Sequence, residues 1–330
     1  MAGQPIGAAP DPGTGMISSM LSRLLKRWAQ GQVLILTFHD ILAEADPLQP
    51  EAIDLARFDM LLDWVRGHFD VVELSAVARK GQRFSNPSAC LTFDDGYRSW
   101  VTRVMPRLVQ RDLHATFFVS TSCLDTPSHW HDRTIELIRT LPSDAVPPLK
   151  GSIPALQTLN VSTPQARQRS AQQLQDHLKT LAPAERDQQL TTLEQHFRIA
   201  PATTSLDRTG LRALAAAGFG IGAHTRHHPI LSRIPFEAAK REILDSREEL
   251  LTELRVPIEG FAYPNGKPGL DFNDRHVELV RESGFSYAVT TQSGSVSPTD
   301  DRYLLKRFTP WGHSPLACSR QVLSTLIRER

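Results

Sequence analysis

Two kinds of hydrophobic pattern alternate along this chain. Short runs such as Val33–Phe38 are almost free of polar residues, which is typical of strands buried on both faces. Longer stretches carry apolar residues three or four positions apart, as in an amphipathic helix with one buried face. The pattern predicts strands at 33–38, 71–74, 89–93, 115–120, 219–223, 258–263, 287–291 and 304–308. It predicts helices at 55–69, 97–113, 206–217, 236–254 and 274–283, and a further helix near the C-terminal end.

Strands that alternate with helices form parallel sheets, because each return to the same edge of the sheet needs a crossover connection. About seven such units in a chain of 330 residues predict one large α/β domain, a closed or nearly closed (β/α) barrel over residues 31–330. In such barrels the catalytic residues lie at the C-terminal ends of the strands. The polar residues that follow each predicted strand are therefore the candidates for catalysis.

Residues 1–30 precede the first predicted strand. Residues 1–15 are rich in Gly, Pro and Ala, which is typical of a disordered segment, and residues 16–30 have the spacing of an amphipathic helix with basic side chains beside its apolar face. We expect this helix to pack on its own domain; a peripheral contact with a membrane surface is the alternative. No secretory signal or membrane span is recognisable, so we expect a cytoplasmic protein.

Residues 125–205 interrupt the alternation of strands and helices. A Pro-rich stretch at 141–154 is followed by two helical runs, at 164–181 and 183–197. Thr163 is a suitable N-cap for the first run, since Pro164 follows it at the first helical position. We expect a helical insertion that lies over one edge of the barrel.

Composition excludes several classes of protein. The formal net charge of +1 provides no basic surface for a polyanion, so we expect no nucleic-acid partner. The three cysteines form no paired motif and predict no disulfide framework.

Two adjacent carboxylates, Asp94 and Asp95, end the strand predicted at 89–93. Successive side chains of a strand point to opposite sides, so one carboxylate can bind a metal while its neighbour accepts a proton. Gly96 permits a tight exit from the strand. Alone, this motif would be read as an ordinary polar turn.

Histidines follow the strand predicted at 219–223. His224 and His228 are four positions apart, a spacing that places both imidazoles on one side of a turn, and His227 is the rival ligand. One carboxylate and two imidazoles suit a divalent metal, zinc above all, and leave coordination positions for water and substrate. Together the two segments predict a hydrolytic metal site.

Three segments, 92–96, 224–229 and 261–266, have the sequences Thr-Phe-Asp-Asp-Gly, His-Thr-Arg-His-His-Pro and Phe-Ala-Tyr-Pro-Asn-Gly. In this order they resemble the motifs of the polysaccharide deacetylases, the NodB-homology or carbohydrate esterase family 4 enzymes. The resemblance extends over about residues 33–310 and includes His39 and Asp40 after the first strand. It implies a distorted (β/α) barrel that removes acetyl groups from N-acetylated or O-acetylated sugars with a metal.

The resemblance also implies roles for individual residues. Asp95, His224 and His228 match the metal ligands, and Asp94 matches the catalytic base. Activation of a water by the metal and removal of its proton by the base agree with this pattern. The oxyanion that forms needs a fixed N–H donor, and the backbone of Asn265 is the candidate.

The chain departs from the family pattern at several positions. Ala262 replaces an arginine that orients the base in many members, and Asn265 stands where an aromatic residue is usual. A late Leu-x-His motif, whose histidine is the general acid, is missing. Arg307 on the last predicted strand could orient Asp94 or bind an anionic substrate, and His313 is a weak candidate for the acid, which stays unassigned.

Five further residues carry weaker signals. His39 ends a strand on the expected catalytic rim, so an active-site position and a structural one are equally favoured. Trp130 could offer a flat face to a sugar ring, although anchoring the insertion is the commoner role, and His129 and Asp132 lie beside it. Cys90, inside a strand, is expected in the core.

The expected substrate is an acetylated carbohydrate or glycolipid. Two alternatives remain open at this point: hydrolysis of a non-sugar amide on the same barrel, and a catalytically silent carbohydrate-binding relative. The presence of both aspartates and both histidines argues against the silent relative.

Overall fold

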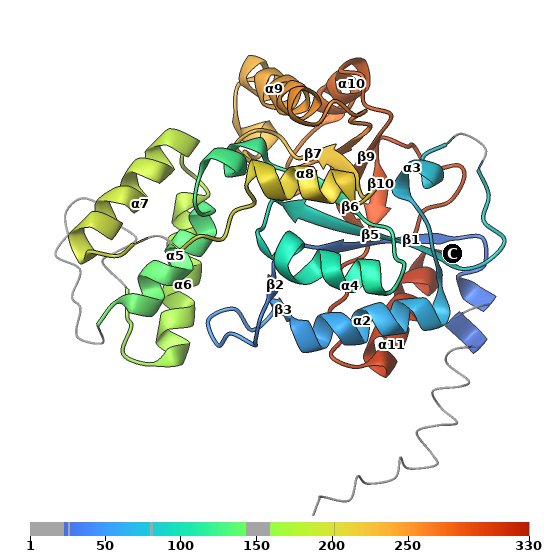
Figure 1. The fold of residues 1–330 in the computed structure, drawn as a ribbon, viewed down its shortest axis with the longest axis horizontal. Helices are drawn as coiled ribbons and strands as arrows, with labels where there is room; N and C mark the ends of the chain where they lie inside the picture. The colour runs from blue at the N-terminus through green and yellow to red at the C-terminus, as the bar shows by residue number, and fades with distance from the viewer. Residues whose placement is uncertain (1–22, 26, 80–81, 143–158, 201, 330) are drawn as a thin grey trace, which may run out of the picture.

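The computed structural model describes residues 23–25, 27–79, 82–142, 159–200 and 202–329. Seven parallel strands lie side by side in the order in which they occur along the chain and form the wall of a distorted (β/α) barrel, as the sequence predicts (Figure 1). In order around the sheet they are β1 (Val33–Phe38), β5 (Ser88–Asp95), β6 (Thr116–Val119), β7 (Gly220–Ala223), β8 (Gly260–Ala262), β9 (Tyr287–Ser293) and β10 (Leu305–Arg307).

The barrel closes between its first and last strands through only a few hydrogen bonds. The N–H of Thr37 donates to the carbonyl of Phe308 (3.1 Å), and the N–H of Phe308 donates to the carbonyl of Ile35 (2.7 Å). These bonds join β1 to Phe308, the residue that follows β10. Since β1 pairs with β5 on its other side, the end of β10 lies close to β5.

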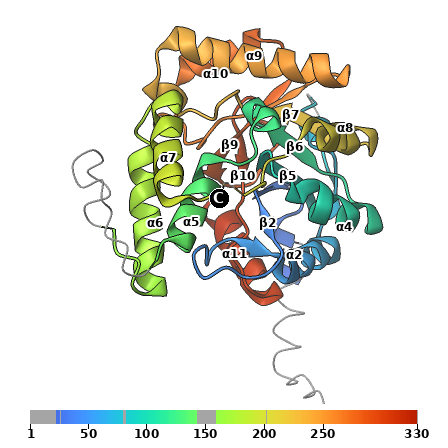
Figure 2. The same cartoon turned by 60° about the vertical axis from the view of Figure 1, so that its left-hand side comes forward.

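Helices cover the outside of the sheet in both views (Figures 1 and 2). Several begin at side chains that cap the first turn, including Asp54, Asp207, Asn273 and Ser314, so local sequence fixes where these helices start. The helices that flank the barrel are α2 (Leu55–His68), α3 (Leu74–Val77), α4 (Met105–Gln110), α8 (Arg208–Ala216), α9 (Phe236–Leu254), α10 (Asp274–Glu282) and α11 (Pro315–Arg328).

Alternate residues of β5 face two different cores. Leu91 and Phe93 belong to the larger core beneath the helices, whereas Cys90 belongs to a smaller one that β1, β6, β8, β9 and β10 also supply. Since this smaller core draws on strands all round the sheet, it lies inside the barrel, and the prediction that Cys90 is a core residue is confirmed. By alternation, Thr92 and Asp94 share the inner side with Cys90.

Three helices between β6 and β7 form a separate layer on one flank of the barrel (Figure 2). α6 (Pro164–Leu178) and α7 (Pro183–Phe197) match the two predicted helical runs, and Thr163 caps α6 by accepting a hydrogen bond from the N–H of Ala166 (3.1 Å). α5 (Trp130–Thr140) was not predicted. The three helices share their own apolar core, which includes leucines of each helix. Part of the predicted Pro-rich stretch, residues 143–158, lies outside the described residues.

Two other local predictions need correction. The strand at 71–74 pairs with β5 only as β4 (Asp70–Val71), because β6 takes the rest of that edge, and Leu74 begins a helix instead. The helix at 97–113 is shorter and starts with a π-helical turn, Trp100–Val104, before α4. Pro106 explains the wide turn, since it has no N–H to donate within a regular α-helix. Two short paired strands, β2 (Ile41–Leu42) and β3 (Ile53–Asp54), were also missed.

The described end of the N-terminal segment packs on the barrel. Leu25 and Ala29 are buried in the larger core, and Trp28 packs against it. The predicted disorder of residues 1–15 and the beginning of the predicted helix at 16–30 lie outside the described residues. Within the described ranges, no helix is both long and apolar enough to cross a membrane.

We expect Gly222→Ala to lower the free energy of unfolding by about 1–3 kcal/mol, because it overpacks the barrel wall. A Cβ there would lie 2.5 Å from the ring of Phe118 and 2.8 Å from the carbonyl oxygen of Gly260. Gly67→Ala is the matched control: this exposed helical glycine has nothing within 4 Å of an added Cβ, so the same change should be neutral or stabilising. Urea unfolding measures both. Equal stabilities would contradict this account of the packing.

Candidate metal centre

The two carboxylates at the end of β5 take different directions because the backbone turns between them. Asp94 continues the inward side of the strand, whereas Asp95 has a φ of 89° and Gly96 a φ of 115°. A Cβ at Gly96 would lie 2.3 Å from the sulfur of Cys123, so this turn requires glycine for space as well as for conformation. Asp95 is thereby aimed at the rim while Asp94 stays within the barrel mouth.

The histidine loop after β7 turns back on itself through two further left-handed residues. Thr225 has a φ of 62° and His228 a φ of 54°, and the N–H of His228 donates to the Thr225 hydroxyl (3.1 Å). Non-glycine residues in this conformation are strained and are often found at functional sites. The turn places the rings of His224 and His228 with centroids 4.7 Å apart.

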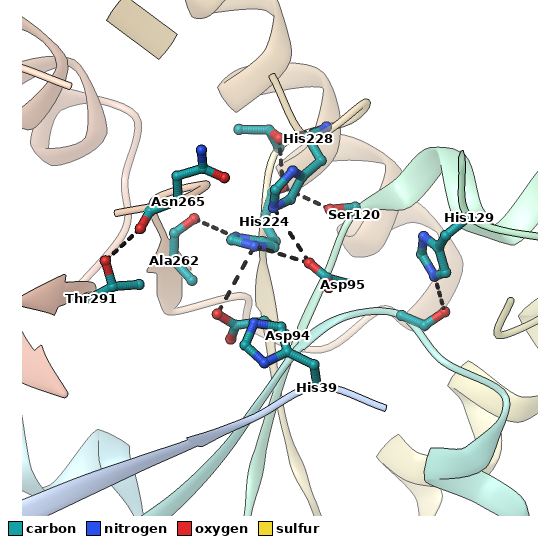
Figure 3. A network of polar contacts seen from close by, with 12 residues as sticks. His39, Asp94, Asp95, Ser120, His129, His224, His228, Ala262, Asn265 and Thr291 are labelled. Atoms are coloured by element: carbon teal, nitrogen blue, oxygen red, sulfur yellow. Dashed lines mark hydrogen bonds and ion pairs between the residues drawn. The ribbon is translucent and has the colours of Figure 1, made fainter. Parts of the chain in front are cut away.

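Both imidazoles meet the same carboxylate oxygen (Figure 3). Nε2 of His224 lies 3.5 Å and Nε2 of His228 lies 3.4 Å from Oδ1 of Asp95. Among the residues that the structure describes, these three side chains form the one group whose donor atoms gather closely enough, within 4.8 Å, to hold a metal ion.

The hydrogen bonds around His224 prepare it to be a ligand. Its Nδ1 lies 2.7 Å from the carbonyl oxygen of Ala262, and since a carbonyl can only accept, Nδ1 carries the proton. Nε2 then faces Asp95 and, in the neutral imidazole, carries the lone pair, which is the usual arrangement of a metal-binding histidine and its supporting carbonyl. One carboxylate oxygen and two imidazole nitrogens therefore fit a divalent ion such as zinc.

His227, the rival ligand, points elsewhere. Its Nδ1 lies 2.8 Å from Oε1 of Glu242 on α9, and the backbone N–H groups of Arg226 and His227 donate to Oε2 of the same carboxylate at 3.0 and 2.8 Å. Glu242 thus anchors the loop from outside and keeps His227 away from Asp95.

Arg307 neutralises Asp94 inside the barrel. Nη1 and Nη2 donate to the two carboxylate oxygens at 2.8 and 2.7 Å, and Nε donates to the carbonyl of Thr290 at 2.7 Å. Both side chains of the pair are almost fully buried. Two roles were considered for Arg307, orientation of Asp94 and binding of an anionic substrate. Its guanidinium lies on Asp94, and no side of it is exposed to a substrate.

Burial and neighbouring charges act in opposite directions on the pKa values of Asp94, Asp95 and His224. Burial alone would raise the pKa of Asp94 and of Asp95. The charge of Arg307 holds the pKa of Asp94 below its usual range, and the hydrogen bond from His224 holds that of Asp95 well below it. Burial also opposes the charged form of His224, but the charge of Asp94, the contact with Asp95 and the bond to Ala262 together outweigh it and raise the pKa of His224. Burial lowers the pKa of His228, which favours the neutral imidazole that a metal needs.

The loop after β8 brings Asn265 to the same rim. Asn265 has a φ of 57° and Gly266 a φ of 74°, and the Thr291 hydroxyl donates to the carbonyl of Asn265. The backbone N–H of Asn265 donates to no residue in the described part of the chain. It is therefore free to meet a ligand.

Two adjoining cavities open over these loops. The smaller, of about 370 Å³, is lined by Asp94, Asp95, His224, His228 and Asn265, and the larger, of about 880 Å³, extends from Asp95 and His228 beneath α5 and α7. His39 also lines the smaller cavity and is exposed. The insertion supplies the other wall of the smaller cavity through Trp130, His131, Gln175, Lys179 and Arg186. Of these, only Trp130 was a candidate from the sequence.

Other sequence candidates have different surroundings. His129 bonds through Nε2 to the carbonyl of Gly96 (2.9 Å) and so joins the insertion to the barrel. Asp132 accepts a hydrogen bond from the hydroxyl of Thr204 (2.6 Å), which ties the two ends of the insertion together. His313 is exposed and lines neither cavity.

Known proteins resemble this chain at two levels. A family model described as polysaccharide deacetylase matches residues 81–146 and 164–288, more than half of the chain, and includes Asp94, Asp95, His224 and His228. No curated protein matches the sequence.

Solved structures share the fold at low identity. The deacetylase PplD of Streptococcus pyogenes, in complex with acetate, is 17% identical with a TM-score of 0.59 over 89% of this chain and 99% of its own. IcaB from Ammonifex degensii is 16% identical with a TM-score of 0.57 over 90% and 97% of the two chains. The de-N-acetylase from Aggregatibacter actinomycetemcomitans is 15% identical with a TM-score of 0.54 over 84% and 94%.

We expect Arg307→Ala to lower the free energy of unfolding by about 3–5 kcal/mol, because it leaves the buried charge of Asp94 without its partner. The neighbouring Lys306 pairs with Glu329 at a half-exposed surface, 2.9 Å apart, so Lys306→Ala should cost less than about 1 kcal/mol. Denaturant unfolding of both variants tests the difference, and a similar small loss in each would refute the role given to the Asp94–Arg307 pair.

Proposed function

The protein belongs to the polysaccharide deacetylase family, and on that premise we propose that it removes acetyl groups from an N-acetylated or O-acetylated carbohydrate with the help of a divalent metal. One observation carries this proposal: Nε2 of His224 and Nε2 of His228 converge on Oδ1 of Asp95 beside the buried carboxylate of Asp94. A ligand set next to a second, separately held carboxylate suits hydrolysis.

Asp95, His224 and His228 would hold the metal, and their two nitrogens and one oxygen favour zinc. When bound, the ion supplies Lewis acidity that makes a water nucleophilic near neutral pH and polarises the acetyl carbonyl. The chain's own residues position the reacting groups and move the protons.

Asp94 is the proposed base. Arg307 keeps it ionised and fixes its plane, yet a carboxylate has about four lone-pair positions and the two bonds from Arg307 use only two of them. Asp94 also lines the smaller cavity, where a water can reach it. It can therefore take a proton from the attacking water without losing the interaction that holds it.

The backbone N–H of Asn265 is the proposed donor to the oxyanion. Asn265 lines the same cavity as the two histidines, and its N–H has no internal acceptor among the described residues. A fixed N–H whose direction is set by the turn at Asn265 and Gly266 needs no reorganisation as negative charge develops on the acetyl oxygen.

His39 is the proposed general acid that protonates the leaving group. It follows β1, the neighbour of β5, and stands beside Asp94 at the cavity (Figure 3). Nε1 of Trp100 donates to the backbone carbonyl of His39 (3.0 Å), which fixes where the ring emerges. His313, the earlier candidate, lies outside the cavity.

Acetate release from a panel of substrates tests the proposed function. Zinc-loaded protein should release acetate from acetylated hexosamines and their oligomers but not from non-sugar acetamides, and chelation should abolish the reaction. Release from the acetamides alone would identify the chain as a different amidohydrolase. Sugar binding without any release would identify it as a silent relative.

Replacement of a metal ligand should remove both metal and activity, since two remaining protein ligands form too weak a site. We expect His228→Ala to lose zinc and turnover, measured by metal analysis of the purified protein and by acetate release. His227→Ala is the control, because that side chain faces Glu242 and the variant should keep its zinc. A full complement of zinc in His228→Ala would show that the ligands were assigned wrongly.

Asp94→Asn should keep the metal but lower kcat by about 10²–10⁴, the usual effect of losing a general base. Zinc content and kcat measured on the same sample separate the two properties. Turnover equal to that of the unmodified protein would show that another group takes the proton.

A further inference from the structure

Arg186 of α7 faces the proposed site from the insertion. It lines both cavities, and although it lies at the surface of a helix, only 8% of it is exposed. Its guanidinium carbon lies 4.7 Å from the centre of the Trp130 ring, so the aromatic face supports the cation from one side. Two helices of the insertion thus hold one positive charge beside the proposed metal ligands.

The guanidinium of Arg186 has no hydrogen-bonding partner in the described ranges. Its Nε is buried without an acceptor, and neither Nη atom donates to a described residue. Burial without a paired anion lowers the pKa of Arg186. A buried cation of this kind is costly to keep in a folded protein unless something else compensates it.

The nearby acidic residues are already committed to other partners. Arg133 donates hydrogen bonds to both carboxylate oxygens of Glu194, at 2.7 and 2.8 Å, and to Asp187 at 3.3 Å. Glu242 accepts from His227 and from two backbone N–H groups. The charges of Asp187 and Glu242 favour the cation from a distance, but neither residue makes a hydrogen bond to it. Arg186 is therefore a cation without a hydrogen-bonded anion of its own, on the wall of both cavities.

We propose that Arg186 binds an anionic group of the substrate, so that the preferred substrate is an acetylated amino sugar that carries a carboxylate or a phosphate. This inference rests on the proposed deacetylase function. A planar guanidinium matches either oxyanion with two parallel N–H donors. Lys179, which directly follows α6, lines the smaller cavity as well and adds a second positive charge from the insertion.

The size of the cavities agrees with such a substrate. The acetyl group would enter the smaller cavity, between Asp94 and Asn265, while the anionic group would lie where the two cavities join at Arg186. Volumes of about 370 and 880 Å³ are in the range that holds a sugar and its substituents. Arg307, which is fully engaged with Asp94, takes no part in this binding.

Three sugars that differ in charge test the proposal on the zinc-loaded full chain: N-acetylglucosamine, N-acetylglucosamine 6-phosphate and N-acetylmuramic acid. We expect kcat/KM to be higher for at least one anionic sugar than for the neutral one by about 10- to 100-fold, the range for charge-assisted hydrogen bonds. Whether the phosphate or the carboxylate is preferred identifies the anion.

Arg186→Gln should remove most of this preference, while Arg186→Lys, which keeps the charge but not the planar pair of donors, should retain part of it. Arg198→Gln is the matched control: Arg198 also borders the larger cavity but is exposed, and this variant should keep the preference. Zinc content equal to that of the unmodified protein verifies that each variant is folded. Equal kcat/KM for the neutral and anionic sugars, or a preference that survives in Arg186→Gln, would overturn the proposal.

Calorimetric binding of the same three sugars separates this inference from the proposed function. If no sugar releases acetate, the deacetylase proposal fails, yet tighter binding of an anionic sugar that is lost in Arg186→Gln would still support the anion site. If acetate is released but binding ignores charge, the anion site fails and the deacetylase stands.

Discussion

Two adjacent carboxylates at one strand end are the feature on which the rest of this site depends. Asp94 and Asp95 carry like charges into a place where water is largely excluded, and such charges are stable only when each has its own counter-charge. Arg307 compensates Asp94 from within the barrel, and the histidine loop faces Asp95 from the rim. Because Arg307 lies on the last strand, the closure of the barrel brings it next to Asp94 on β5.

The loops that hold the site store conformational strain. Asp95, Thr225, His228 and Asn265 all have positive φ values, although none is glycine. Their conformations persist because side chains and backbone of neighbouring loops bond to them; for example, the N–H of Ser120 donates to the carbonyl of Asp95 (3.0 Å). Strain of this kind aims several polar groups at one point, which regular strand ends could not do.

The barrel could be predicted because the spacing of apolar residues within a short segment indicates a helix or a strand without knowledge of the rest of the fold. The helix predicted at 236–254, for example, has the observed bounds of α9. The motifs also located Asp94, Asp95, His224, His228 and Asn265 on one rim, since parallel strands end on the same side. α5 was missed; its apolar face packs on the other two helices of the insertion rather than on the barrel. The sequence offered Arg307 two roles without a choice between them and gave no signal for Arg186, because the surroundings of both depend on contacts between residues distant in sequence.

The central claim is that Asp95, His224 and His228 hold one divalent metal beside Asp94. The most direct measurement is an anomalous difference map from crystals of the full chain grown with zinc, with data collected on both sides of the zinc absorption edge. We expect a single strong peak in contact with all three side chains and with none of His39, His129 and His227. A peak at one of those other histidines, or no peak at Asp95 under saturating zinc, would contradict the claim.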